Sequence, residues 1–243
     1  MIAGAGVLVA LGLAVALVAV LQGGDDGGGG SADASSPAAS VTATGLSAGQ
    51  AEAHAVATRV AMAPQDWGAG YAKSEDYEAD PADESHVTSG CEWVTRASRA
   101  GTLASVYRGV YYESSGNSSS TEVRVFTDAA TAESYMRDVE ANTHRCPSQH
   151  SGKSRWTGIR EATAPSVTGF DEVVAEEGTQ SADSEGKKTD FRYVYFTGRV
   201  GNTVLITIAL DEPANAAALN KRGKDTLQEL QQRLEAASTT AQQ

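Results

Sequence analysis

The sequence is poor in the residues that usually carry chemistry. Of its 243 residues, two are cysteine and four are histidine, and no Lys or Arg precedes Arg59. It contains no H-E-x-x-H, G-x-S-x-G or G-x-G-x-x-G pattern, so common metalloprotease, hydrolase and dinucleotide-binding signatures are missing. His144 and His150 flank a cysteine but are interpreted as exposed residues rather than metal ligands. These absences predict a protein that is not an enzyme and has no catalytic residues, cofactor or metal site.

Positive charge is also scarce. Acidic residues outnumber basic ones by 31 to 19, which gives a formal net charge of −12 at pH 7. A chain of this charge repels nucleic acid phosphates and anionic lipid headgroups. Nucleic acid is therefore excluded as an expected partner.

What the chain does have is a long apolar beginning. Residues 1–21 contain no charged residue and no proline. As a helix they would be about 31 Å long, close to the thickness of the bilayer core. An export signal normally has a basic start and a shorter apolar core, which favours a retained anchor over a cleaved signal. Both interpretations place the rest of the chain outside the cytoplasm, and the first predicts a single-pass protein of the cell membrane.

The next segment, residues 22–45, consists almost entirely of Gly, Ala, Ser, Asp and Thr. Such a composition buries too little apolar surface to fold, so it predicts a flexible linker. Residues 46–243 then remain as one extracytoplasmic domain, long enough to form a core of its own.

Cys91 and Cys146 are the two cysteines. In an oxidising compartment an isolated pair predicts a disulfide. A metal pair or a redox couple is the alternative, but metal sites recruit more ligands and redox couples have C-x-x-C spacing. Cys146 also ends a helical stripe of apolar residues, so the bond would join that helix to the strand that contains Cys91.

Hydrophobic periodicity predicts an α+β domain with a mainly antiparallel β-sheet and flanking helices. A capping box at Ser47 and Gln50 predicts the first helix, and Gly201-Asn202 predicts a hairpin between the two strands with the strongest signals. Gly223 is expected to weaken the last helix. Helices are expected at 47–62, 127–146 and 213–237; strands at 89–97, 102–113, 121–127, 155–161, 170–178, 189–200 and 203–210; and polar loops at 74–85, 147–154 and 179–188.

The layout resembles the extracellular sensor domain of PknH-type receptor Ser/Thr kinases of mycobacteria and related kinase-free actinobacterial envelope proteins. The matching features are the segment 126–132 leading into a helix that ends at Cys146, and the Gly201-Asn202 hairpin. The resemblance implies a central, largely antiparallel sheet and a cleft for a small ligand. The chain departs from the family by having one cysteine pair instead of two and Thr143 where a Trp is usual. Without a kinase domain, signalling by phosphorylation is not implied.

The sequence thus predicts a membrane-anchored extracytoplasmic ligand-binding or sensor module. Its partners would be an unidentified small ligand or envelope component, and the membrane through residues 1–21. The alternatives are a cell-envelope or secreted protein-interaction domain without a small ligand, and an exported hydrolase with an unrecognised site. No single ligand-binding residue is identified, although tyrosines and arginines of 104–112 and 191–199 are expected to line any cleft.

Overall fold

The structure, a computed structural model, describes residues 46–115, 117–152, 154–184, 187–212 and 216–240. Its helices are α1 (Ala48–Val60), the short 3-10 helix η1 (Pro64–Trp67), α2 (Ala129–Arg145) and α3 (Ala216–Thr240). Its strands are β1 (Tyr71–Ala79), β2 (Glu84–Val87), β3 (Trp93–Arg96), β4 (Thr102–Tyr112), β5 (Ser118–Phe126), β6 (Ser148–Ser151), β7 (Ser154–Glu161), β8 (Glu172–Ser184), β9 (Lys187–Val200) and β10 (Thr203–Asp211). Residues 1–45, where the anchor and linker are expected, lie outside the described residues. Within the described part of the chain, no helix has the length and apolarity to cross a membrane.

Eight strands form one sheet in the order β1-β4-β5-β10-β9-β8-β7-β6, with antiparallel pairing throughout. The predicted α+β class with an antiparallel sheet is confirmed. Strands β9 and β10, which have the strongest strand signals in the sequence, lie at its centre, where both faces of a strand are covered. Gly201 between them has a φ of +58°, the left-handed conformation that this hairpin requires.

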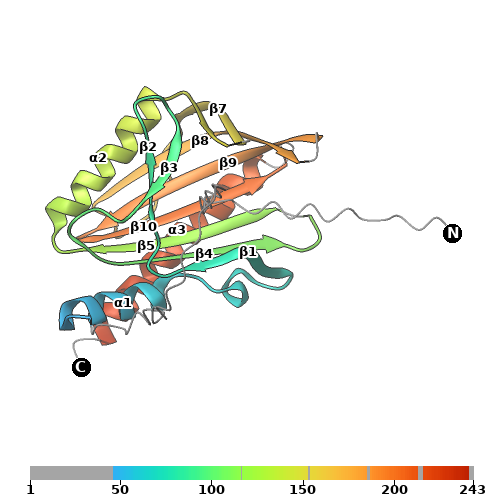
Figure 1. Cartoon of the computed structure of the whole chain (residues 1–243). Helices are drawn as coiled ribbons and strands as arrows, with labels where there is room; N and C mark the ends of the chain where they lie inside the picture. Colours follow the sequence, from blue (N-terminus) through green and yellow to red (C-terminus); the bar gives the residue numbers. More distant parts are fainter. Residues whose placement is uncertain (1–45, 116, 153, 185–186, 213–215, 241–243) are drawn as a thin grey trace, which may run out of the picture.

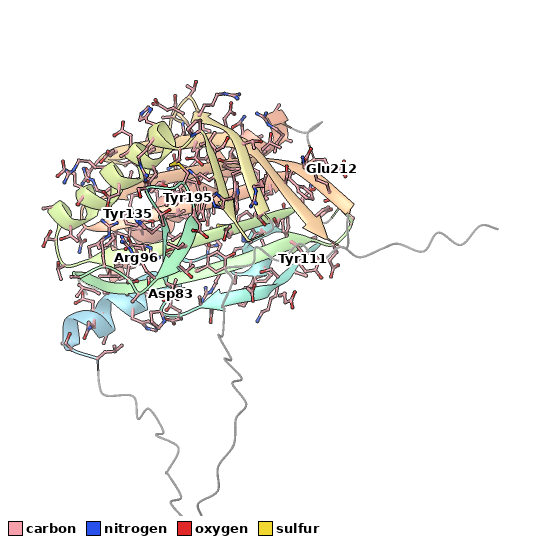
Figure 2. The ribbon with its side chains drawn as sticks, turned by 45° about the horizontal axis from the view of Figure 1, so that its top comes forward. Asp83, Arg96, Tyr111, Tyr135, Tyr195 and Glu212 are labelled. Carbon is pink, nitrogen blue, oxygen red and sulfur yellow. A yellow bond between two sulfur atoms is a disulfide. The ribbon has the colours of Figure 1, made fainter. Side chains whose placement is uncertain are left out.

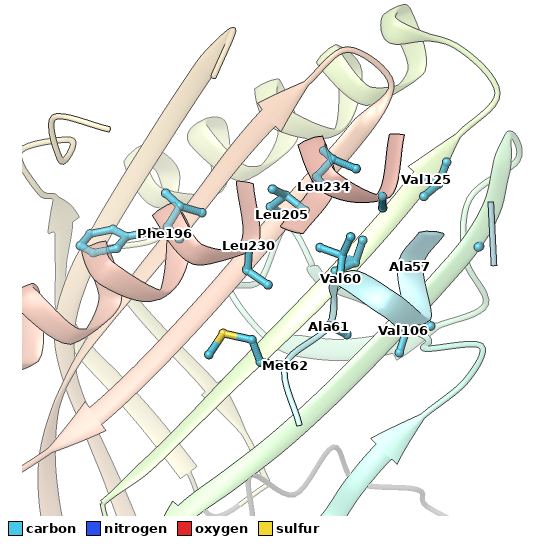
Figure 3. Close-up of a cluster of buried hydrophobic side chains, with 14 of the residues drawn as sticks. Ala57, Val60, Ala61, Met62, Val106, Val125, Phe196, Leu205, Leu230 and Leu234 are labelled. Atoms are coloured by element: carbon cyan, nitrogen blue, oxygen red, sulfur yellow. The ribbon is translucent and has the colours of Figure 1, made fainter. Parts of the chain in front are cut away.

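Helices α1 and α3 cover one face of this sheet. Val60 from α1 and Leu230 and Leu234 from α3 meet Phe196 and Leu205 from the sheet in the largest cluster of buried apolar side chains (Figure 3). The α1 helix begins as predicted, because Ser47 and Gln50 cap each other's backbone. Burial of these side chains supplies most of the stabilisation, at about 25 cal/mol per Å² of apolar surface.

Helix α2 and the β2–β3 hairpin cover the opposite face, in front of the sheet in Figure 1, where α3 passes behind it. The predicted inward stripe of α2 is confirmed by the burial of Ala132, Tyr135 and Met136. They pack on Phe126 and Val204, which point away from the α1–α3 side. Asp128 caps the helix by accepting a hydrogen bond from the Thr131 backbone at 2.8 Å.

The tip of the β2–β3 hairpin is attached to the end of α2. Cys91 in the hairpin turn forms a disulfide with Cys146, the C-cap of α2. Beside it, the Arg145 guanidinium donates to the carbonyl oxygens of Thr88 and Val87 at 2.8 and 3.0 Å. Cys91 precedes β3 rather than lying in a strand that starts at 89, since its positive φ of 62° belongs to a turn.

Three predicted polar loops are wrong. Residues 74–85 include most of β1 and the start of β2, 147–154 contain β6 and the start of β7, and β8 and β9 continue as a ladder to Ser184 and from Lys187. In all three places the strands pair through backbone groups, which do not depend on side-chain polarity. A charged sequence such as that of β1 is also typical of an edge strand, where it opposes pairing with other chains. The predicted helix start at Pro213 lies outside the described residues.

Candidate functional site

A small cleft of about 40 Å³ lies between α2, the β2–β3 hairpin and the sheet. The hairpin and α2 form its walls, and strands β8 and β9 form its floor. The lining residues are Glu84, Ser85, His86, Val87, Trp93, Arg99, Tyr135, Asp138, Val139, Asn142, Gln149, Glu176 and Tyr195. Figure 2 shows Tyr135 and Tyr195 next to each other on this face of the molecule.

One end of the cleft holds a compact ion cluster around Glu84. Its carboxylate is 1% exposed and accepts from the Arg96 guanidinium at 2.6 Å and from Arg99 at 2.8 and 3.0 Å. Arg99 also pairs with Asp138 of α2 at 3.0 Å. Burial alone would raise the pKa of Glu84, but the hydrogen bonds from the two arginines outweigh it and lower the pKa to about 2. Glu84 is therefore ionised, and this cluster bridges the hairpin to α2.

A second buried pair lies on β5, beneath the base of the hairpin. Arg124 is fully buried, forms an ion pair with Glu122, and donates to the Asp83 carbonyl at 2.6 Å and the Ser98 hydroxyl at 3.1 Å. Its guanidinium also lies 5.8 Å from the centre of the Tyr135 ring. Arg124 thus links to the sheet the two chain segments that precede and follow the hairpin.

The other end of the cleft contains Glu176 from β8, which is 6% exposed. The Thr143 hydroxyl donates to Oε2 at 2.6 Å and the Tyr193 hydroxyl donates to Oε1 at 2.7 Å. Among the residues that the structure describes, no Arg or Lys forms an ion pair with this carboxyl group. Burial raises the pKa of Glu176, and the two hydroxyl donors reduce that shift without reversing it.

Aromatic side chains separate the two ends. Burial raises the pKa of Tyr135 to about 12 and that of Tyr195 well above its usual value, so both hydroxyls stay neutral. Trp93 stacks against Trp156 with ring centres 5.9 Å apart and hydrogen-bonds to Gln149. The cleft therefore combines aromatic walls with buried carboxyl groups.

The prediction of which strands line the cleft is correct only in part. Tyr195, from the strand that was expected to contribute, lies in the cleft, but strand β4 does not line it. Arg108 of β4 instead points to the other face of the sheet, where it donates to the Thr58 and Ala61 carbonyls of α1. Glu84 and Glu176 were missed because both lie in acidic stretches that look solvent-exposed. Within the described residues, no three His, Cys, Asp or Glu side chains gather as a metal site would need.

Neither family models nor curated protein sequences match this chain. Among solved structures, the fold is similar to the extracellular domain of PknH from Mycobacterium tuberculosis, with 14% identity over 72% of this chain and 95% of that domain and a TM-score of 0.47. It also matches an uncharacterized protein of Mycobacterium smegmatis, the Rv0999 ortholog, with 8% identity over 56% of this chain and 69% of that one and a TM-score of 0.34. The match to PknH agrees with the resemblance that the sequence indicates. Both TM-scores are below 0.5, so neither likeness bears on the site, and its chemistry rests on this chain's own residues.

Proposed function

We propose that this chain is an extracytoplasmic ligand-binding or sensor module, attached to a cell membrane by residues 1–21 through the linker 22–45. The domain of residues 46–243 binds a small ligand in the cleft between α2 and the β2–β3 hairpin and has no catalytic activity of its own. The observation that carries this proposal is the convergence of buried charged and aromatic side chains on one cavity from three distant parts of the chain.

The energetics of the cleft support a binding role. Buried ion pairs are often replaceable by apolar residues with no loss of stability, because the desolvation of each charge offsets the attraction between them. A fold that only needed to hold α2 and the hairpin on the sheet could do so with an apolar contact. Charged groups around a cavity provide what an apolar contact cannot, which is selective recognition of a polar ligand.

The disulfide supports the proposed location. A bond between Cys91 and Cys146, 55 residues apart, persists in oxidising compartments outside the cytoplasm. Intact mass of the unreduced protein, after thiol alkylation in the native membrane fraction, tests this together with the anchor. A full-length mass without alkyl groups is expected. Two alkylated thiols would refute the extracytoplasmic location, and a shortened mass would refute the retained anchor.

A ligand screen by thermal shift on the purified full chain tests binding in the cleft. A ligand at 100 times its Kd stabilises the folded state by about 2.7 kcal/mol. For a domain of this size that corresponds to a rise in Tm of roughly 5 to 10 °C. Cations, anions, neutral sugars, peptides, cell-wall fragments and lipids are the classes to compare.

Two substitutions on α2 test whether the ligand binds in the cleft. Val139→Phe fills the cleft with a larger side chain and should abolish the shift. Glu140→Phe adds the same ring at the next, exposed position of the helix and should leave the shift intact. Equal shifts in both variants would place the ligand elsewhere on the molecule.

The alternative, a protein-interaction domain, predicts a large exposed apolar patch. In the described part of the chain, Leu46 is the large apolar side chain that remains exposed, at 55%. It lies where the linker is expected to join the domain. Within the described residues, this side chain does not form a large apolar patch, whereas the cleft supports the ligand-binding proposal.

A further inference from the structure

The charges at the first end of the cleft balance each other. The carboxylates of Glu84 and Asp138 face the guanidinium groups of Arg96 and Arg99 at 2.6 to 3.0 Å. Two negative and two positive groups leave this end with no net charge. It therefore attracts neither a cation nor an anion strongly.

In the part of the chain that the structure describes, Glu176 at the second end has no oppositely charged partner. Thr143 and Tyr193, which donate to its two oxygens, are neutral. A carboxylate has about four lone-pair sites, so two donors leave room for a third group. A buried carboxylate without a cation is costly, and the group keeps its proton instead. The raised pKa of Glu176 is consistent with that state.

The walls next to Glu176 favour a positive charge. Tyr195 and Trp93 line the cleft, and the negative face of an aromatic ring attracts ammonium groups. The Tyr135 ring already shows this behaviour, because the Arg99 guanidinium lies 4.9 Å from its centre. His86 does not oppose a cation, since burial lowers its pKa and keeps its imidazole neutral at pH 7.

The size of the cavity limits the ligand. A volume of about 40 Å³ holds on the order of three water molecules. Pockets for drug-sized ligands are about 300 to 1,000 Å³. The cleft is therefore large enough for a head group of a few non-hydrogen atoms, and the rest of a larger ligand would extend past Asp138 and Asn142 on α2.

We propose that the cleft binds the head group of a small organic cation, an amine or quaternary ammonium, seated between the Glu176 carboxyl group and the rings of Tyr195 and Trp93. This inference rests on the proposed ligand-binding function and names the class of ligand. Its contacts are an ion pair to one carboxylate and cation–π contacts to two rings, the pattern of aromatic ammonium sites.

Binding of the cation exchanges it for a proton. Burial raises the pKa of Glu176, so the empty cleft holds the group protonated wherever the pH lies below that raised pKa. The cation stabilises the carboxylate, so in that pH range the proton leaves to solvent as the cation enters. The other groups around the site do not replace Glu176 in this exchange. The Tyr195 and Tyr135 hydroxyls stay neutral, and Glu84 stays ionised between its arginines. Burial raises the pKa of Glu122 on β5, but this group pairs with Arg124 and is not among the residues that line the cleft.

The test uses the full chain with methylammonium, ethanolamine and tetramethylammonium chlorides as probes, and sodium acetate, sodium chloride and glucose as comparisons. Tryptophan fluorescence, to which Trp93 in the cleft contributes, and calorimetry measure the Kd. We expect saturable binding of at least one of the three cations and none of the comparison solutes. Below the pKa of Glu176 the affinity should fall tenfold per pH unit, with release of about one proton per cation.

Glu176→Gln has the shape of the protonated acid but cannot ionise. We expect it to weaken cation binding at least tenfold and to abolish proton release. Glu177→Gln is the matched control, because it removes one charge from the next residue of β8, which pairs with Arg160. Its Kd should stay within twofold of the wild type.

The possible outcomes separate this inference from the proposed function. Equal cation binding by wild type and Glu176→Gln would overturn the role of Glu176, and so would cation binding without proton release throughout the acidic pH range in which the affinity falls. Shifts caused by anions or neutral compounds alone would overturn the cationic ligand but leave a ligand-binding module. The proton measurement needs only the wild-type chain, so it decides the question even if Glu176→Gln does not fold. If no class of compound binds or raises the Tm, both proposals are refuted.

Discussion

Replacement of Gly223 by alanine should destabilise this protein, although alanine is the better helix former. In the middle of a helix, Gly→Ala normally stabilises by about 1 kcal/mol. At Gly223, however, a Cβ would lie 2.7 Å from Cε2 and 3.0 Å from Cδ2 of Phe196, and 3.0 Å from Cγ2 of Val194. Both side chains are at most 2% exposed, so the close contact would have to be relieved inside the core. The missing side chain of Gly223 is what lets α3 lie against β9.

The size of the effect follows from these two opposing contributions. Overpacking of a well-packed core costs about 1 to 3 kcal/mol, and the gain in helix propensity offsets about 1 kcal/mol of it. We expect Gly223→Ala to lower the free energy of unfolding by up to about 2 kcal/mol. Gly49→Ala near the start of α1 is the control, because no atom lies within 4 Å of its new Cβ. It should raise the free energy of unfolding by up to about 1 kcal/mol.

Urea unfolding of the two variants and the wild type, followed by circular dichroism, measures both changes. The opposite signs are the test, because both substitutions are the same chemical change in a helix. A stabilised Gly223→Ala variant would refute the close approach of α3 to β9. A destabilised Gly49→Ala variant would refute the assumption that Gly→Ala stabilises these helices where the new Cβ meets no neighbouring atom.

Three further predictions concern the attachment of the β2–β3 hairpin. Arg124→Met should lower the free energy of unfolding by about 3 to 5 kcal/mol, because it leaves Glu122 buried without its cation. The control, Arg137→Met on the exposed side of α2, should change it by no more than about 0.5 kcal/mol. Similar changes for the two variants in urea unfolding would contradict the role of Arg124. The pKa of Glu84 is lowered from 4.5 to about 2, so its contribution to stability is complete above pH 4.5 and is lost as the pH falls towards 2. The stability gap between wild type and Glu84→Gln should shrink across that window, and a constant gap would show that Glu84 does not carry it. Reduction of the disulfide should lower the free energy of unfolding by about 4 kcal/mol, given its separation of 55 residues, and identical melting with and without reductant would contradict this.

Much of the candidate site could not be predicted, because its charged residues look ordinary in the sequence. Glu84 belongs to an acidic run in which an exposed carboxylate is the usual case, and Glu176 is followed by a second glutamate. Whether such a group is buried depends on the element that covers it. Here α2 and the β2–β3 hairpin cover both carboxyl groups, and Arg99 and Thr143, which meet them, come from distant positions.

The sequence alone determined the elements whose periodicity is strong. The strand signals of β9 and β10, the stripe of α2, the cap at Ser47 and the pairing of the two cysteines follow from local sequence patterns and from the cysteine count. These patterns extend over a few residues, so they can be read without knowing the neighbours in space.

The secondary structure of the polar segments depends on tertiary contacts. Strand β1 and the outer ends of β8 and β9 are strands because a neighbouring backbone is present to pair with, and side-chain polarity does not report such a neighbour. Gly223 looks like a weak point in a helix, but packing makes it a point of close approach. Folding buries Glu176 and, among the described residues, brings no Arg or Lys to pair with its carboxyl group. A negative charge at that position must be neutralised by a proton or by a bound ligand, which makes Glu176 a candidate ligand-binding group.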